Sequence, residues 1–101
     1  MIGEHIRTLR ESENILLRQL SAKLDMDQAM LSKIERGERS FKRGHIDVLA
    51  NIFKQPKKDL LTMWLADKIL KIVKSEKFTK EALKLAIDNH TKPKCYPWNK
   101  D

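Results

Sequence analysis

Cysteine is almost absent from this sequence: Cys95 is the only one among 101 residues. A single thiol cannot close an internal disulfide, so the fold depends on its hydrophobic core, as in proteins of a reducing cytoplasm. No apolar run approaches the roughly 20 residues that span a bilayer. The chain is polar within three residues of Met1, which predicts no signal peptide. We therefore expect a cytoplasmic protein with no membrane partner.

Patterns typical of catalytic and metal sites are also missing. His5, His45 and His90 are scattered along the chain, and no Cys or His pair has the spacing of metal ligands. No glycine-rich phosphate loop occurs among the three glycines. The sequence thus predicts no catalytic residue, no metal and no cofactor. An enzyme is an alternative that these patterns disfavour.

Turn formers and aromatic residues are few. The chain has three glycines, three prolines, two Trp, one Tyr and three Phe. Leu, Ile, Lys, Glu and Ala dominate instead, which favours helix over strand. Exposed aromatic platforms suit single-stranded RNA, so RNA binding is a further alternative that the scarcity of aromatic residues disfavours. We predict an all-α fold.

Charge, in contrast, is abundant, with a formal net charge of +7. All six arginines lie before residue 44, whereas residues 56–101 are basic through lysine alone. A basic protein favours an anionic partner, and arginine suits bidentate recognition of phosphates and guanine edges. Charge by itself does not decide between nucleic acid and a membrane surface.

Apolar residues recur at helical spacing in six segments. The helices are expected near Ile2–Leu9, Leu16–Leu24, Asp27–Arg36, Ile46–Phe53 and Lys57–Ser75, and from Thr79 onward. The apolar residues of the fifth segment form more than one stripe, as in a helix that packs on two sides. After His90 the chain has two prolines and no periodicity, which indicates a flexible tail over residues 91–101.

Residues with special backbone preferences mark the helix ends. Asn14 tolerates the left-handed conformation in which helices often stop. The carboxylate of Asp27 can accept the free N–H groups of a first turn, and Gly37 follows the third helix as a C-terminal glycine. Thr79 is expected to cap the sixth helix. The inward positions of that helix are then Ala82, Leu83, Ala86 and Ile87.

Two short helices joined by a tight turn, the second beginning at a capping residue, describe a helix-turn-helix. Residues 17–37 resemble the helix-turn-helix of the lambda-repressor-like family, also called the Cro or XRE family. Leu20, Ser21 and Leu24 stand at matching positions, and Met26 is expected to fill the buried position of the turn. The string SKIERG at 32–37 matches one of the family's most recognisable strings. The resemblance extends over about residues 2–66. It implies a five-helix DNA-binding domain, here with a long fifth helix and an added C-terminal helix.

In such a motif the N-terminal residues of the second helix meet base edges in the major groove of B-DNA. Gln28, Ala29 and Lys33 are therefore the expected base-contacting residues, and the resemblance implies the same positions. Glutamine can bind adenine at two points, alanine can touch a thymine methyl group, and lysine can donate to guanine. The alternative is that Gln28 is merely a solvated residue of a first turn.

Contacts to DNA phosphates are expected from helix ends and from a basic loop at residues 38–44. Such contacts fix the register without reading the sequence. The candidates are Arg18, Ser32, Arg36, Arg39, Ser40, Lys42 and Arg43. The sequence departs from the family at Leu17, where a glutamine often contacts phosphate, and at Asp25, where glycine is common. Met30 is bulkier than usual and is expected to shield the core.

The charged residues Arg10 and Glu35 also invite a functional interpretation, but the resemblance implies a structural one. In the family these positions pair with each other inside the domain, which fixes the first helix against the third. We predict the same structural ion pair here.

Family members often bind two half-sites, about 34 Å apart, as homodimers. The resemblance therefore implies a homodimer on a palindromic operator. The fifth helix, apolar on more than one side, is the candidate for the dimer contact, with Leu70 and Val73 as the expected interface residues. Trp64 can belong to the core or to the interface, and we favour the core. Residues 1–75 are expected to form the DNA-binding domain, with the helix-turn-helix at about 17–36. Residues 76–90 are expected to form a helix for dimerisation or packing.

The predicted function is that of a nucleoid-associated transcriptional regulator of double-stranded DNA. A restriction-modification controller and a phage-type repressor are the two roles that the resemblance favours. No ligand-binding module is recognised, so no small-molecule ligand is expected. The alternative is an antitoxin that binds a protein partner and also regulates its own gene through DNA.

Overall fold

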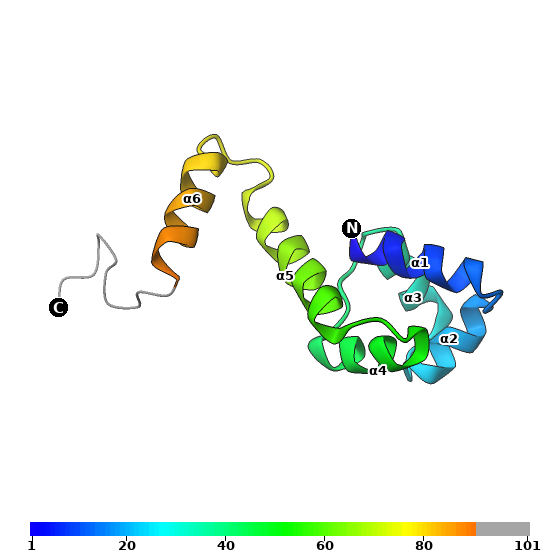
Figure 1. Cartoon of the computed structure of the whole chain (residues 1–101). Helices are drawn as coiled ribbons and strands as arrows, with labels where there is room; N and C mark the ends of the chain where they lie inside the picture. Colours follow the sequence, from blue (N-terminus) through cyan, green and yellow to red (C-terminus); the bar gives the residue numbers. More distant parts are fainter. Residues whose placement is uncertain (91–101) are drawn as a thin grey trace. The chain divides into compact units, whose positions relative to one another are not determined.

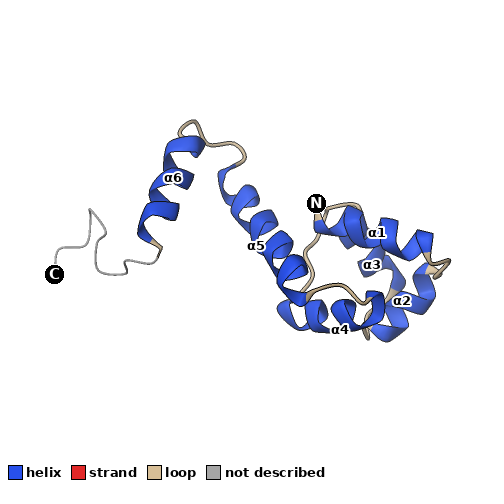
Figure 2. Ribbon diagram, in the orientation of Figure 1, coloured by secondary structure: helices blue, strands red, loops and turns tan. Residues whose placement is uncertain are grey.

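Six α-helices and no strand make up residues 1–90, the part of the chain that this computed structural model describes (Figures 1 and 2). The helices are α1 (Ile2–Ser12), α2 (Leu17–Lys23), α3 (Gln28–Glu35), α4 (Arg43–Phe53), α5 (Lys57–Val73) and α6 (Thr79–Asn89). The prediction of an all-α fold is confirmed over these residues. The tail predicted at 91–101 lies outside the described residues.

The chain divides into two compact units, Met1–Ile69 and Leu70–Asp101. The boundary between these units falls inside α5, whereas the sequence placed a domain boundary after residue 75. The functional division of the chain stays a prediction. Both helices of the helix-turn-helix, α2 and α3, lie in the N-terminal unit.

The core of the N-terminal unit draws side chains from all five of its helices. In Figure 1, α3 lies among α1, α2 and α4. The buried apolar residues are Ile2, Ile6, Leu20, Leu24, Leu31, Ile34, Phe41, Ile46, Leu49, Phe53, Leu60 and Trp64. Full burial of a Leu, Ile or Phe side chain contributes about 1.5–3 kcal/mol, so this cluster is the main source of stability that holds α3 in place.

Left-handed residues close the turns between the short helices. Asn14 and Asp25 have φ angles of 57° and 55°, and Gly37 has a φ of 84°. Asn and Asp tolerate this region because their short polar side chains hydrogen-bond locally, and glycine adopts it without a steric penalty. The predicted stops after α1 and α3 are confirmed by these angles.

The beginning of α4 differs from the prediction. A loop was expected over residues 38–44, but the helix starts at Arg43, and Lys42 is its N-cap residue. The N–H of Lys42 donates to Nδ1 of His45 at 3.1 Å, so a histidine in the first turn of α4 satisfies a backbone group that would otherwise be unpaired. The loop between α3 and α4 therefore ends two residues earlier than expected.

The predictions for α6 are wrong in two respects. The Oγ1 of Thr79 donates to the carbonyl oxygens of Val73 and Glu76, at 2.7 and 2.8 Å, and Phe78 is the N-cap residue. Thr79 therefore does not accept an N–H group as a cap does. No residue of α6 is buried, and Ile87 is 69% exposed. Of the four positions expected to face inward, Leu83 is half-buried, whereas Ala82, Ala86 and Ile87 are exposed.

Candidate nucleic-acid interface

The start of α3 is fixed by Asp27. Its Oδ1 accepts the N–H of Met30 at 2.7 Å, and its backbone is extended. Such a cap satisfies one of the four free N–H groups at a helix N-terminus and is worth about 1 kcal/mol. The left-handed Asp25 turns the chain just before it, so α3 begins at Gln28.

The two sides of α3 differ sharply in burial. Leu31, Ile34 and Glu35 are buried on one side, where α3 packs against α1 and α2. Gln28, Ala29 and Lys33, the predicted base-contacting residues, are all exposed. Because consecutive helical residues are 100° apart, these three lie within an arc of about 140°. The exposed side of α3 therefore presents one amide, one methyl group and one ammonium group together.

Met30 lies next to this exposed arc. Its side chain is 36% exposed, and it lines a hollow of about 300 Å³ with Met26, Ile34 and His45. The predicted role of Met30 in shielding the core stays a prediction. Met26, expected to be buried in the turn, is only half-buried and packs against the core.

The residues predicted to contact phosphates occupy helix ends and the loop after α3. Arg18 is exposed in α2, Ser32 is half-buried in α3, and Arg36 is the C-cap residue of α3. The remaining candidates follow within seven positions of Arg36 and are all exposed: Arg39, Ser40, Lys42 and Arg43. The structure thus places the residues predicted to contact bases and phosphates on α2, α3, the loop after α3 and the start of α4.

Arg36 already has an acidic neighbour. Its Nε donates to Oε2 of Glu38 at 2.9 Å, and its Nη1 donates to Oγ of Ser32. The hydrogen bond and the charge of Glu38 raise the pKa of Arg36, and the same contact lowers the pKa of Glu38. Both side chains are about half exposed, so this pair contributes little to stability.

The loop between α3 and α4 is anchored by Phe41, for which the sequence analysis predicted no role. Its side chain is fully buried in the core, and its carbonyl oxygen accepts the Nε1–H of Trp64 at 2.7 Å. A buried indole N–H needs such a partner. The prediction of Trp64 in the core is confirmed. An aromatic residue inside an otherwise charged loop was the signal available in the sequence.

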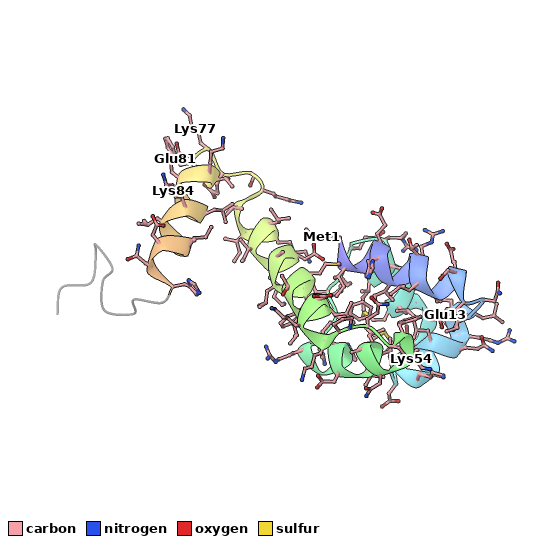
Figure 3. The ribbon with its side chains drawn as sticks, in the orientation of Figure 1. Met1, Glu13, Lys54, Lys77, Glu81 and Lys84 are labelled. Carbon is pink, nitrogen blue, oxygen red and sulfur yellow. The ribbon has the colours of Figure 1, made fainter. Side chains whose placement is uncertain are left out.

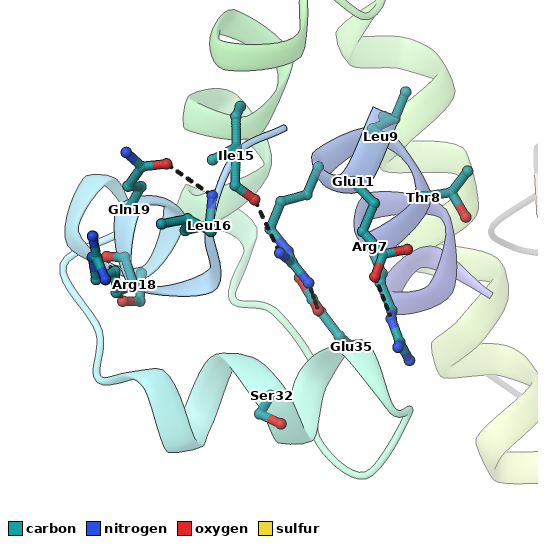
Figure 4. Close-up of polar contacts among 12 residues, drawn as sticks. Arg7, Thr8, Leu9, Glu11, Ile15, Leu16, Arg18, Gln19, Ser32 and Glu35 are labelled. Atoms are coloured by element: carbon teal, nitrogen blue, oxygen red, sulfur yellow. Dashed lines mark hydrogen bonds and ion pairs between the residues drawn. The ribbon is translucent and has the colours of Figure 1, made fainter. Parts of the chain in front are cut away.

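Arg10 and Glu35 form a two-point ion pair between α1 and α3 (Figure 4). Arg10 Nε and Nη2 donate to the two carboxylate oxygens of Glu35 at 2.9 and 3.0 Å, and Nη1 donates to the carbonyl oxygen of Ile15 at 3.0 Å. The side chains are only 12% and 4% exposed. The hydrogen bonds to Glu35 raise the pKa of Arg10. Each of the three guanidinium nitrogens therefore donates to an acceptor within the protein.

His45 lies in the first turn of α4. Burial, and then the charge of Lys42, lower the pKa of His45. Its ring lies edge-on to Phe41, with the centroids 6.0 Å apart. The Nδ1 that accepts the Lys42 N–H has to be unprotonated, so the neutral imidazole is the form that fits this position. The scattered positions of the three histidines in the sequence gave no sign of this contact.

The described residues offer no metal centre and no membrane span. No group of three His, Cys, Asp or Glu side chains within residues 1–90 is placed to hold a metal ion. None of the six helices is long and apolar enough to cross a bilayer. Of the two residues predicted at a dimer interface, Leu70 is exposed, and Val73 is half-buried at the end of α5.

A helix-turn-helix family model matches residues 6–60 of the chain. The matched region runs from the middle of α1 to the first turn of α5, so it contains the whole helix-turn-helix and the loop after it. No curated protein and no solved structure matches the chain.

Proposed function

The chain belongs to the lambda-repressor-like, or Cro/XRE, family of helix-turn-helix DNA-binding transcription regulators, and we propose that it acts as a homodimer on a palindromic operator. The exposed side of α3 would enter the major groove. Gln28, Ala29 and Lys33 would contact base edges there, where amide, methyl and ammonium groups distinguish base pairs.

One observation supports this assignment most strongly, the contrast between the two sides of α3. The helix is held from behind by the buried residues Leu31, Ile34 and Glu35, while the side with Gln28, Ala29 and Lys33 has no cover in the described chain. A helix fixed in this way can contact DNA without a further loss of backbone entropy. The exposure of these side chains is thus suited to recognition.

Phosphate contacts from both ends of the motif would fix the register of α3. We assign them to the polar and basic residues around α3, namely Arg18, Ser32, Arg36, Arg39, Ser40, Lys42 and Arg43. The anchoring of the loop through Phe41 and Trp64 supports this assignment, because it limits the freedom of the backbone that carries the loop residues.

A second copy of the chain is the partner that we propose for the C-terminal unit. None of residues 70–90 is buried, and this stretch exposes the large apolar side chains of Leu70, Ile72, Phe78, Leu85 and Ile87. Apolar surface of this kind marks an interaction site. Lys77, Glu81 and Lys84 project from one side of the unit (Figure 3), which leaves other sides for apolar contact. We place Leu70 and Val73 in this interface.

In this proposal the protein is a repressor or a restriction-modification controller that responds to its own concentration, through cooperative occupation of two half-sites. The exposed apolar residues of the C-terminal unit also fit a different protein partner, as in an antitoxin that regulates its own gene. Co-purification with a protein encoded next to it would favour that second function.

A binding experiment on DNA upstream of the protein's own gene tests base recognition. We expect Gln28→Ala and Lys33→Ala each to weaken operator binding by about 1–3 kcal/mol, because each loses a contact to a base edge. Binding to a duplex of unrelated sequence should change much less. Gel shifts of both duplexes at a fixed salt concentration measure the difference.

Lys58→Ala is the matched control, because Lys58 is an exposed lysine of α5 outside the proposed interface. It should bind both duplexes as the wild type does. Wild-type affinity of both Gln28→Ala and Lys33→Ala for the operator would contradict the assignment of the reading face.

A further inference from the structure

A hollow of about 310 Å³ lies between α1, α2 and α3. It is lined by Arg7, Arg10, Leu17, Ser32, Glu35 and Arg36. Ser32 and Arg36 were already candidates for phosphate contact. Arg7 was not, because no motif in the sequence draws attention to it. Arg7 of α1 therefore lines the same hollow as Ser32 and Arg36.

The two charged side chains in the deeper part of the hollow, Arg10 and Glu35, are already paired with each other. Arg10 donates twice to Glu35 and once to the carbonyl oxygen of Ile15, and both side chains of the pair are nearly buried. Their charges cancel, and their hydrogen-bonding groups are engaged with each other. An anion that enters the hollow is therefore held by other residues.

The rim carries two arginines whose partners are weakly held. Arg7 Nε donates to Glu11 Oε2 at 3.3 Å, and Arg36 Nε donates to Glu38 Oε2 at 2.9 Å. All four side chains are between 49% and 56% exposed. Exposed pairs of this kind are worth at most about 1 kcal/mol. A phosphate can displace such carboxylates because it offers several strong acceptor oxygens to the forked guanidinium groups.

The side chains around the hollow indicate where a phosphate would sit. Figure 4 shows Arg7 extending from α1 on the side where Ser32 and Glu35 of α3 lie. The Oγ of Ser32 is already within hydrogen-bond reach of Arg36 Nη1. Leu17 lines another side, and its side chain has no group that can donate a hydrogen bond. The side-chain donors of the hollow that are not committed to a buried pair thus come from α1 and from the C-terminal half and C-cap of α3.

We propose that Arg7 and Arg36, with the hydroxyl of Ser32, hold one backbone phosphate of bound DNA in this hollow. The proposal rests on the proposed DNA binding. Ser32 and Arg36 flank Lys33 of the reading face by one and three residues, so the hollow lies within one turn of it. Arg7 then ties α1 to the same DNA strand, and the angle of α3 in the groove is fixed at a second point.

Salt titrations with a labelled duplex of random sequence test this proposal, because a phosphate contact does not depend on sequence. We expect Arg7→Ala and Arg36→Ala each to weaken binding about five-fold at low salt. Each should also flatten the slope of log affinity against log salt by about 0.9. The double variant should flatten it by no more than about 0.9, because the two arginines hold the same phosphate and the loss of either one already releases it. Lys58→Ala is the single-charge control and should change neither quantity appreciably.

The competing carboxylates provide an independent measurement. Glu11→Gln and Glu38→Gln should each tighten binding, by up to about five-fold, because they free the arginines for the phosphate. Affinity and salt slope of Arg7→Ala that equal those of Lys58→Ala would overturn the proposal. So would a double variant whose slope falls by about twice as much as that of either single variant. A wild-type protein that binds no duplex at all would instead overturn the proposed function, and this inference with it.

Discussion

Gly3 sets how closely α1 approaches α3. A Cβ atom at this position would lie 2.1 Å from the carbonyl oxygen of Ile34 and 3.2 Å from the Cα of Glu35. Both neighbours are backbone atoms that no change of side-chain rotamer can move. The same two helices are joined by Arg10 and Glu35, so the spacing that glycine permits is also the one at which this ion pair forms.

We therefore expect Gly3→Ala to destabilise the protein by about 1–3 kcal/mol or more, because the added methyl group has to push two helices apart. Urea unfolding followed by circular dichroism measures the change. Gly44→Ala is the control: nothing lies within 4 Å of its Cβ position in α4, and removal of a helical glycine should stabilise by about 0.5–1 kcal/mol. Equal stability of the two variants would contradict this account of Gly3.

The Arg10–Glu35 pair illustrates why a charged residue in a recognition motif need not bind the ligand. Glu35 lies in α3 only two residues after Lys33, yet its side chain is 4% exposed, and its carboxylate is saturated by Arg10. Removal of one partner of a buried pair leaves the other charge uncompensated. The pair therefore fixes α3 in position, and recognition is left to the exposed side of the helix.

At the scale of the elements, we expect the stability of the start of α4 to depend on pH. The Lys42 N–H donates to the unprotonated Nδ1 of His45, and burial together with the Lys42 charge lowers the pKa of His45 in the folded state. The unfolded chain has the ordinary value of about 6.5. The unfolded state thus binds the proton more tightly, so stability is complete above about pH 6.5 and is lost as the pH falls through the folded pKa.

Replacement of His45 with Gln should remove part of this dependence. The Oε1 of Gln can accept the same N–H group at every pH, as in a capping box. We expect the melting temperature of the wild type to fall more between about pH 7.5 and 5.5 than that of His45→Gln. Thermal denaturation at a series of pH values measures both curves, and parallel curves would show that His45 does not contribute.

The sequence predicted the helix-turn-helix more accurately than the elements after it. Asp27 and Gly37 located α3 because capping and left-handed glycine depend on the local chain alone. Phe41 and Trp64 form a contact over 23 positions, which periodicity does not reveal. Thr79 failed as a cap because its hydroxyl found nearby carbonyl groups to donate to, a choice between two local partners that residue type does not decide.

The candidate site also has features that the local sequence predicts and features that depend on contacts between distant residues. Exposure of Gln28, Ala29 and Lys33 followed from the inward spacing of Leu31 and Ile34, since a helix with one buried side exposes the other. Arg7 could not be found in this way. Its place beside Ser32 and Arg36 depends on how α1 packs against α3, and that packing is set by contacts far apart in the sequence.

At the scale of the whole molecule, the buried apolar residues of the described chain are confined to its N-terminal two thirds. Every buried apolar residue within 1–90 lies between Ile2 and Trp64, in the N-terminal unit. The apolar residues after them include Ile72, which is 74% exposed. The sequence predicted a fifth helix that packs on two sides, but α5 buries only Leu60 and Trp64. A second molecule would cover what the chain itself leaves exposed.

Leu70→Glu tests whether that second molecule is another copy. Leu70 is exposed, so the substitution should leave the stability of the single chain almost unchanged. It would place two carboxylates in the proposed interface, where burial of an unpaired charge is costly. We expect light scattering at micromolar concentration to give about twice the 11.9 kDa chain mass for the wild type, and the chain mass itself for Leu70→Glu.

Leu16→Glu is the control for this measurement, because Leu16 is an equally exposed leucine in the N-terminal unit. It should remain a dimer.

If Leu70→Glu is monomeric, its operator binding should fall much further than its binding to random duplex, because two linked half-sites gain from effective concentration and one does not. A wild-type protein that is already monomeric at micromolar concentration would count against the dimer, and α3 would then have to specify its site alone.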